Sequence, residues 1–372
     1  MKNKLPTFSR RDFIRSLSTT AAALALGPVR IKEALAYNEG RKLGIALLGL
    51  GRYSTGQLGP ALRETKLCQL KGVITGHPEK GQKWAADFGF PEKNIYNYDN
   101  MDRIADNRDI DIVYVVTPPA LHPEFVIRAA KAGKAVISEK PMATSVADCD
   151  RMIAACKDAK VQLGIGYRLH YDPFHKEMWR LARTKEFGRF MKMNGEFAFV
   201  MRQREWRIDK KLGGGGPMMD LGIYVVHAAC MAADAPIVAV TAQEEPKANP
   251  ELFNEVEEKL RWTMEFESGA HCEGVTGFNH SGNTFRAEGD KGWFQFDRNA
   301  FSYSGAACTT SRGPMNAAPV NKQALQMDDF ADCVLTGRRT SVPGELGRRD
   351  MVIVSAVYEA ARTGQRVKVK IA

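Results

Sequence analysis

Along residues 43–166, short runs of apolar residues alternate with stretches in which apolar positions recur at helical spacing. This alternation is typical of a parallel α/β sheet. Strands are expected at 43–48, 67–75, 111–117, 135–138 and 162–165, with helices at 55–64, 79–88, 122–132 and 145–157. The pattern predicts a doubly wound, Rossmann-type nucleotide-binding domain over residues 43–166.

The second half of the chain has a different pattern. Long strand-like stretches follow one another at 190–201, 237–245, 256–266 and 269–277, with few helices between them. They predict an α+β domain with a mostly antiparallel sheet over residues 167–321. Two further helices, at 322–335 and 345–362, belong to a C-terminal segment of residues 322–372, which is expected to return to the first domain.

The beginning of the chain has the pattern of an export signal. Residues Ser9 to Ile14 (SRRDFI) carry twin arginines, an apolar stretch covers 17–26, and Ala34–Ala36 offers an A-x-A cleavage site. A twin-arginine signal peptide is therefore predicted over residues 1–36, followed by a short arm at 37–42, and the mature protein is expected in the periplasm. Because this route exports folded proteins, a nicotinamide enzyme that used it would have to carry its dinucleotide tightly.

The remaining composition excludes several classes of protein. The apolar leader is too short to span a bilayer, and no later stretch is expected to be long and apolar enough, so no stable membrane insertion is predicted. The formal net charge of +10 lies half in the leader, and the rest is dispersed, which argues against nucleic-acid binding. The seven cysteines form no Cys-x-x-Cys pair, so free buried thiols are expected rather than a metal site or a disulfide framework.

The sequence Gly49-Leu50-Gly51-Arg52-Tyr53-Ser54 follows the first predicted strand and precedes a helix. In this place, glycines allow a tight turn and let backbone N–H groups approach a pyrophosphate. Ser54 replaces the usual third small residue, so the dinucleotide fingerprint is incomplete. An ordinary tight turn is the alternative.

The end of the second strand indicates which dinucleotide is bound. NAD-binding domains place a carboxylate here, whereas this chain reads Val73-Ile74-Thr75-Gly76-His77. Arg52 and Lys80 are expected nearby, where they would bind a 2′-phosphate together with the Thr75 hydroxyl. NADP is therefore favoured over NAD, unless both cations are simply solvated surface charges.

Two segments carry residues suited to acid–base chemistry. Glu139-Lys140-Pro141 follows the strand at 135–138, at the sheet edge where open α/β proteins bind ligands. Asp220 and Tyr224 lie four residues apart after Gly213–Pro217, hence on one helix face. A tyrosine serves as an acid–base catalyst when a nearby ammonium stabilises its phenolate, and Lys140 is the predicted neighbour. The alternative makes Asp220 a surface acid and Tyr224 a half-buried aromatic residue.

Together these segments resemble the family of glucose–fructose oxidoreductase, inositol dehydrogenase and MocA-type proteins. The similarity extends over residues 42–367 and is greatest to the glucose–fructose and aldose–aldose oxidoreductase branch. Tyr224 is selective for this branch, since many family members have histidine there. The resemblance rests on the stretches GLGRY (49–53), YNYDN (96–100), EKPMATSVADC (139–149), IGYRLHYDP (165–173), EWR (205–207), GGGGPMMDLGIY (213–224) and YEAARTGQRV (358–367).

The resemblance implies a tightly bound NADP(H), a substrate domain with an open sheet whose outer face forms a homodimer, and a ping-pong cycle. In that cycle an aldose is oxidised at C1 to its lactone and a second sugar is reduced. Lys140 and Tyr224 match the catalytic pair, and Asp220 matches the acid that positions them. The positions that match cofactor contacts are Gly49, Gly51, Arg52, Tyr53, Thr75, Lys80, Tyr98, Pro118, Leu121, His122, Glu139, Lys140, Arg168, Trp206, Arg207 and Tyr303.

The chain departs from the glucose–fructose enzyme in its arm, which is long and proline-rich there and short here, so a dimer is predicted rather than an arm-dependent tetramer. Two alternative functions remain at the sequence level. One is a redox-assisted glycoside hydrolase that retains its nicotinamide cofactor. The other is a non-catalytic sugar or nucleotide sensor, against which the set of Lys140, Asp220 and Tyr224 argues.

Overall fold

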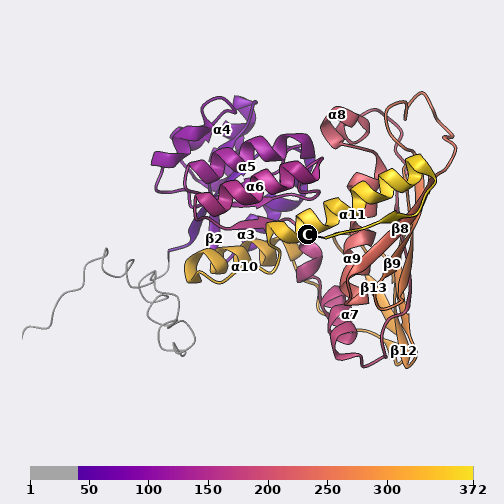
Figure 1. The fold of residues 1–372 in the computed structure, drawn as a ribbon. Helices are drawn as coiled ribbons and strands as arrows, with labels where there is room; N and C mark the ends of the chain where they lie inside the picture. Colours follow the sequence, from indigo (N-terminus) through magenta and orange to yellow (C-terminus); the bar gives the residue numbers. More distant parts are fainter. Residues whose placement is uncertain (1–40, 372) are drawn as a thin grey trace, which may run out of the picture.

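Two β-sheets organise residues 41–371, the part of the chain that this computed structural model describes (Figure 1). The predicted leader and most of the predicted arm lie outside the described residues. One sheet belongs to the predicted nucleotide-binding domain and the other to the predicted α+β domain. This arrangement confirms the predicted fold class.

The first sheet has six strands, all parallel, in the order β3-β2-β1-β4-β5-β6. The central strand β1 is buried along its whole length, as expected for a parallel strand covered on both faces. The prediction missed β3, which has only two residues. The strands are β1 (Leu43–Leu48), β2 (Cys68–Ile74), β3 (Ile95–Tyr96), β4 (Ile112–Val115), β5 (Ala135–Ser138) and β6 (Leu163–Ile165).

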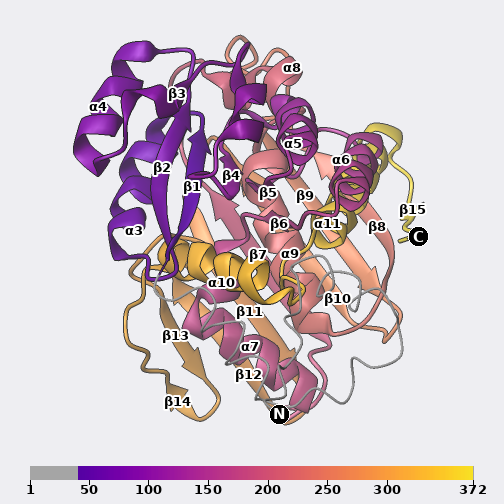
Figure 2. The ribbon, with the colours of Figure 1, turned by 90° about the vertical axis from the view of Figure 1, so that its left-hand side faces the viewer.

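Helices cover both faces of this sheet (Figure 2). On one face lie α5 (His122–Lys131) and α6 (Val146–Asp158). On the other face lie α3 (Gly59–Glu64), α4 (Pro78–Phe88) and, from the far end of the chain, α10 (Lys322–Thr336). The helix predicted at 55–64 begins instead as a π-helical turn, Ser54–Leu58.

The second sheet has nine strands in the order β14-β13-β12-β11-β7-β10-β9-β8-β15. Its pairings are antiparallel except between β7 and β10. The prediction missed β11 to β15. The strands are β7 (Lys192–Ala198), β8 (Ile237–Glu244), β9 (Lys259–Phe266), β10 (His271–Gly277), β11 (Gly282–Gly289), β12 (Gly292–Arg298), β13 (Ala307–Thr310), β14 (Gly313–Pro314) and β15 (Val367–Lys368).

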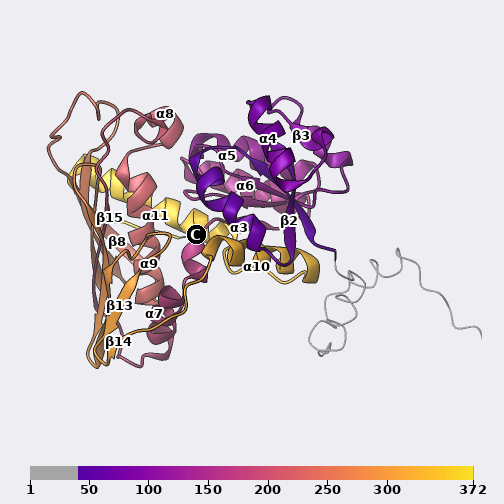
Figure 3. The same ribbon diagram turned by 180° about the vertical axis from the view of Figure 1, so that it is seen from behind.

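The helices beside the large sheet lie on its face toward the first domain (Figures 1 and 3). They are α7 (Pro173–Thr184), α9 (Ile223–Ala233) and α11 (Gly344–Thr363). The last of these packs against both α6 and β8, so it joins the two domains. The prediction missed α7, although Asp172 caps it and Pro173 occupies its first position, which are usual helix-start signals.

The expectation that no stretch after the leader is long and apolar enough to cross a membrane is wrong. Among residues 41–371, the helical stretch Lys210–Ala233 is long and apolar enough to cross a membrane by length and composition. Its most apolar window is 89% buried inside the protein, as in the core helix of a globular domain. The seven cysteines, all within the described residues, are free thiols, and each except Cys230 is buried.

Close packing within the large sheet gives a test of the fold. A Cβ on Gly274 would lie 2.2 Å from Cε2 of Trp262, its cross-strand neighbour. We expect Gly274→Ala to lower the free energy of unfolding by about 1–3 kcal/mol, the usual cost of overpacking. Gly56→Ala is the matched control, because a Cβ there meets nothing within 4 Å. Urea unfolding measures both, and equal stability of the two variants would contradict the packing described.

Candidate active site

A cavity of about 340 Å³ lies where the carboxyl ends of the parallel strands face the second domain. Ligands of open α/β sheets bind at this edge. Both domains contribute to the wall. The lining residues are Gly49, Leu50, Gly51, Arg52, Tyr53, Thr75, His77, Lys80, Tyr98, Val116, Thr117, Pro118, Pro119, Glu139, Lys140, Trp206, Arg207, Asp220, Tyr224 and Tyr303.

The glycine-rich turn after β1 is closed by a side chain. Gly49 has φ +99°, a conformation that favours glycine, and a Cβ there would lie 2.9 Å from the Val116 carbonyl oxygen. The Ser54 hydroxyl donates a hydrogen bond of 2.6 Å to the Gly49 carbonyl. Ser54 therefore stabilises this turn, although it departs from the usual dinucleotide fingerprint.

The residues of the cavity fit a dinucleotide. A Cβ on Gly51 would meet nothing within 4 Å, which leaves backbone exposed in the turn where a pyrophosphate would bind. The Thr117 hydroxyl at the end of β4 is buried and has no hydrogen-bond partner in the protein. At the end of β2, the Thr75 hydroxyl accepts a hydrogen bond from the His77 amide. Arg52 and Lys80 line the same cavity, as expected for a site that receives a 2′-phosphate.

Lys140, Asp220 and Arg207 form a charged cluster in the cavity wall. Lys140 Nζ donates to the Asp220 carbonyl oxygen at 2.6 Å and to Oδ1 at 3.3 Å, and Arg207 Nε donates to Oδ2 at 2.9 Å. Burial raises the pKa of Asp220, but the charges of Lys140 and Arg207 outweigh burial and hold this pKa below its usual value. The carboxylate therefore stays ionised and fixes Lys140.

Tyr224 lies between two cations. Its side chain is 5% exposed, and Lys140 Nζ lies 4.3 Å from the centre of its ring. Arg168 Nη2 donates to the Tyr224 hydroxyl at 3.3 Å. The structure thus places Lys140 over the ring, whereas Arg168 interacts with the phenol oxygen itself.

Arg168 lies behind the cavity rather than in its wall. It is 2% exposed, and it donates to the carbonyl oxygens of Phe301 and Ser302. Its guanidinium also lies 4.5 Å from the ring centre of Tyr303. In the described chain, Arg168 therefore positions Tyr224 and the loop that carries Tyr303.

Two other predicted residues, Leu121 and His122, are also outside the cavity wall. The ring nitrogens of His122 face the carbonyl oxygens of Thr117 at 2.8 Å and of Pro141 at 3.1 Å, so His122 links the two turns that lie behind the site. Leu121 packs against the core. The sequence missed several wall residues, although each lies within two positions of a strand end or of a predicted site residue: Leu50, His77, Val116, Thr117 and Pro119.

Glu139 is a buried acid at the end of β5. It accepts a hydrogen bond of 2.6 Å from the Tyr114 hydroxyl and another from the Lys140 amide. Burial raises the pKa of Glu139, and neither the Tyr114 hydrogen bond nor the charge of Lys140 reverses this effect. A Cβ on Gly166 would lie 2.6 Å from Glu139 Oε1, so this backbone needs glycine to admit the carboxyl group.

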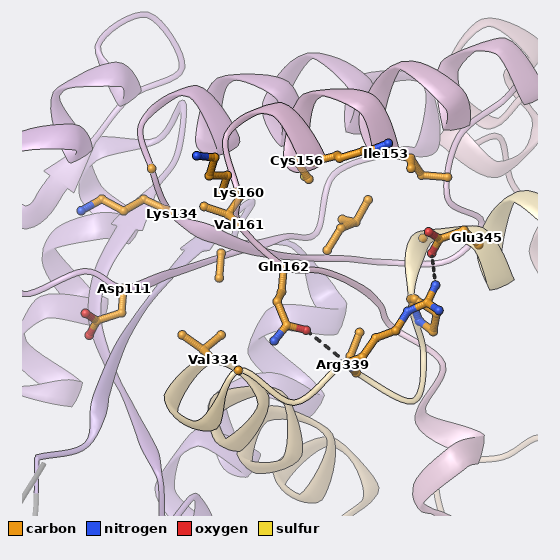
Figure 4. A pocket seen from close by; sticks show the side chains of 18 of the residues that line it. Asp111, Lys134, Ile153, Cys156, Lys160, Val161, Gln162, Val334, Arg339 and Glu345 are labelled. Carbon is orange, nitrogen blue, oxygen red and sulfur yellow. Dashed lines mark hydrogen bonds and ion pairs between the residues drawn. The ribbon is translucent and has the colours of Figure 1, made fainter. Parts of the chain in front are cut away.

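A larger cavity of about 710 Å³ lies at the other edge of the parallel sheet (Figure 4). Its wall includes Asp111, Ala135 and Leu163, at the amino ends of the strands, together with residues of α6 and of the segment between α10 and α11. Gln162 accepts a hydrogen bond from the Thr340 amide, and Arg339 pairs with Glu345. This is not the edge at which such sheets bind ligands, and the residues described above do not reach it.

Comparison with known families agrees with this geometry. Residues 43–167 match the oxidoreductase family with an NAD-binding Rossmann fold known as Gfo/Idh/MocA. Residues 175–295 match the C-terminal domain of the same family. The chain belongs to the Gfo/Idh/MocA oxidoreductase family. It is therefore an oxidoreductase whose first domain has the fold that binds NAD(P).

Several members of the family are similar over most of the chain. The crystal structure of aldose–aldose oxidoreductase from Caulobacter crescentus, complexed with glycerol, is 40% identical with a TM-score of 0.86, covering 88% of this chain and 100% of that one. A D-xylose 1-dehydrogenase [NADP(+)] from Haloarcula marismortui is 28% identical, covering 87% of this chain and 92% of the relative. A 1,5-anhydro-D-fructose reductase from Ensifer adhaerens is 25% identical, covering 81% and 91%.

The depressed pKa of Asp220 gives a test of the charged cluster. The ionised carboxylate contributes stability that is fully present above its unfolded-state pKa of about 4 and is lost as the pH falls through the lower folded-state value. We expect Asp220→Asn to be less stable than the wild type by a constant amount from about pH 7 to pH 5, and the difference to shrink at lower pH. Urea unfolding across this range measures it, and a difference that already vanishes near pH 6 would contradict the ion pairing.

Proposed function

We propose that this protein is a periplasmic sugar oxidoreductase that retains NADP(H) between half-reactions. In the first half-reaction an aldose is oxidised at C1 to its lactone, and in the second another sugar is reduced, an aldose to its alditol or a ketose to its polyol. The observation that carries the proposal is the placement of Tyr224 between Lys140 and Arg168 at the wall of a dinucleotide-type cavity. The similarity to aldose–aldose oxidoreductase supports the choice of substrate.

Tyr224 is the proposed acid–base catalyst. Its side-chain oxygen, which lies beside Arg168 on a ring that Lys140 covers, accepts the proton of the C1 hydroxyl of the first sugar. In the second half-reaction the phenol returns a proton to the carbonyl oxygen of the second sugar. Because Arg168 has no lone pair to accept a proton, its role is to stabilise charge and not to relay the proton.

Lys140 holds the sugar oxygen in place. Asp220 takes two of its three N–H donors, one through its carbonyl oxygen and one through Oδ1. The third is available for the reacting oxygen, where the ammonium stabilises developing negative charge. Asp220 is a positioning residue, because it fixes Lys140 and Arg207 and lets neither cation turn away from the cavity.

A dinucleotide bound in this cavity would supply the acceptor, and then the donor, of the hydride exchanged with C1 of the sugars. The turn at Gly49–Arg52 would hold its pyrophosphate. The absence of a carboxylate at the end of β2, together with Arg52 and Lys80 in the cavity wall, favours NADP. Retention of the dinucleotide follows from the twin-arginine signal predicted at 1–36, since an exported enzyme has no access to the cytoplasmic pool.

The proposed assembly is a homodimer through the outer face of the large sheet. Within residues 41–371, the helices beside this sheet, α7, α9 and α11, all lie on its inner side (Figure 3). The outer face is thus available to a second copy of the chain.

Assay without added cofactor tests this function. Purified, dialysed protein mixed with an aldose is expected to form lactone and alditol in equal amounts, because each oxidation must be balanced by one reduction on the same dinucleotide. Chromatography of the products and of the nucleotide released on denaturation measures both. Strict dependence on added NADP would contradict retention.

The same assay distinguishes the alternatives. Release of the aglycone from an aryl glycoside, without net oxidation, would instead identify a redox-assisted glycoside hydrolase. Binding of sugars without any product would identify a sensor.

A further inference from the structure

The dinucleotide turn reaches across to the second domain through two successive residues. Arg52 forms an ion pair with Glu205, and the ring of Tyr53 packs on Tyr303 with ring centres 5.9 Å apart. Glu205 and Tyr303 belong to two different loops of the second domain. The turn that is expected to hold the pyrophosphate is thereby tied down at two points.

Glu205 occupies a central place among the charges around the cavity. One carboxylate oxygen accepts from Arg52, and the other accepts from Arg207 Nη1 at 3.2 Å. Arg207 in turn is fixed by Asp220, and Asp220 by Lys140. A continuous chain of opposite charges therefore runs from the dinucleotide turn to the catalytic lysine. This chain of charges crosses between the two domains twice, at Arg52–Glu205 and at Lys140–Asp220, and Glu205 makes the more exposed crossing.

The second contact, between Tyr53 and Tyr303, involves a loop that hydrogen bonds hold in place. Arg168 and Lys322 both donate to the Ser302 carbonyl oxygen, at 3.0 Å each, and Asn283 accepts from the Phe301 amide at 2.7 Å. These contacts fix the loop that presents Tyr303 to Tyr53. The loop that carries Tyr303 is held by buried groups. The ion pair between Arg52 and Glu205 is more exposed, with the Arg52 side chain 77% exposed, so it is the contact that can open more easily.

We propose that the Arg52–Glu205 ion pair is a latch that slows the departure of the dinucleotide, and that Glu205 is its positioning residue. The inference rests on the proposed function in so far as that function requires a retained cofactor. Glu205 uses one terminal nitrogen of Arg52, and a guanidinium has five N–H donors, so the others remain for a cofactor phosphate. Glu205 thus fixes the Arg52 side chain at the cavity wall while leaving N–H donors for a phosphate.

The size of the effect follows from the exposure of the pair. Exposed ion pairs contribute up to about 1 kcal/mol, so loss of the latch should speed dissociation by about two- to fivefold. The effect should weaken as salt screens the two charges. Sugar oxidation is not needed to observe it.

Dissociation of NADPH from full-length Glu205→Gln protein tests the latch. The protein is loaded with NADPH, chased with excess NADP+, and followed by nucleotide fluorescence. We expect dissociation about two- to fivefold faster than in the wild type at low salt, with the two rates converging at high salt. Glu205→Asp, which keeps the charge, should recover part of the difference.

The matched control is Glu255→Gln. Glu255 also pairs with an exposed arginine, Arg204, but within the second domain, so its loss should leave the dissociation rate unchanged. Equal rates for Glu205→Gln and the wild type at low salt would overturn the latch, as would equal acceleration in Glu255→Gln. A protein that binds NADPH, shows this pattern and turns over no sugar would instead contradict the proposed function and leave the latch standing.

Discussion

The ion pair between Lys140 and Asp220 is the interaction on which the site depends. Lys140 comes from the end of β5 in the first domain, and Asp220 comes from the turn before α9 in the second, so the pair joins both halves of the molecule at the cavity. Breaking a buried pair of this kind leaves an uncompensated charge, which typically costs about 3–5 kcal/mol. Arg207 shares the carboxylate and keeps it ionised. Lys140 is therefore held in position for catalysis only when the two domains are correctly packed.

The surroundings of Tyr224 depend on the same packing of the two domains. Its helix belongs to the second domain, and Arg168 begins the short turn that follows β6 at the start of that domain, whereas Lys140 follows β5 in the first domain. Lys140 lies over the ring of Tyr224 only when the domains are packed together. Helix α11 supports that packing, because it contacts both domains. The catalytic arrangement is thus a property of the interface, with residues placed by rigid strands and helix starts rather than by mobile loops.

Much of this could be predicted from the sequence, because alternation of apolar runs is a strong signal for buried parallel strands. β1, β2, β4, β5 and β6 are such runs, whereas β3 is two residues long and carries too little pattern. The later strands β11 to β14 were missed because each of them carries at most two buried apolar residues, such as Phe294 and Phe296 in β12, which is too few to make a clear pattern. The role of Arg168 depends on a contact with Phe301 far along the chain, which no local pattern encodes. The hydrogen bond from Ser54 to Gly49 spans only five residues, and it was missed because Ser54 departs from the usual fingerprint.

The most direct test of the account is a single turnover of Tyr224→Phe with its own bound dinucleotide. The phenylalanine ring keeps the packing against Lys140 but removes the oxygen that exchanges the proton. The account predicts that the purified variant still contains the dinucleotide and that its reduction by an aldose, followed by stopped-flow absorbance, is slower by about 10²–10⁴-fold. Reduction at the wild-type rate would contradict the assignment of Tyr224 as the acid–base catalyst.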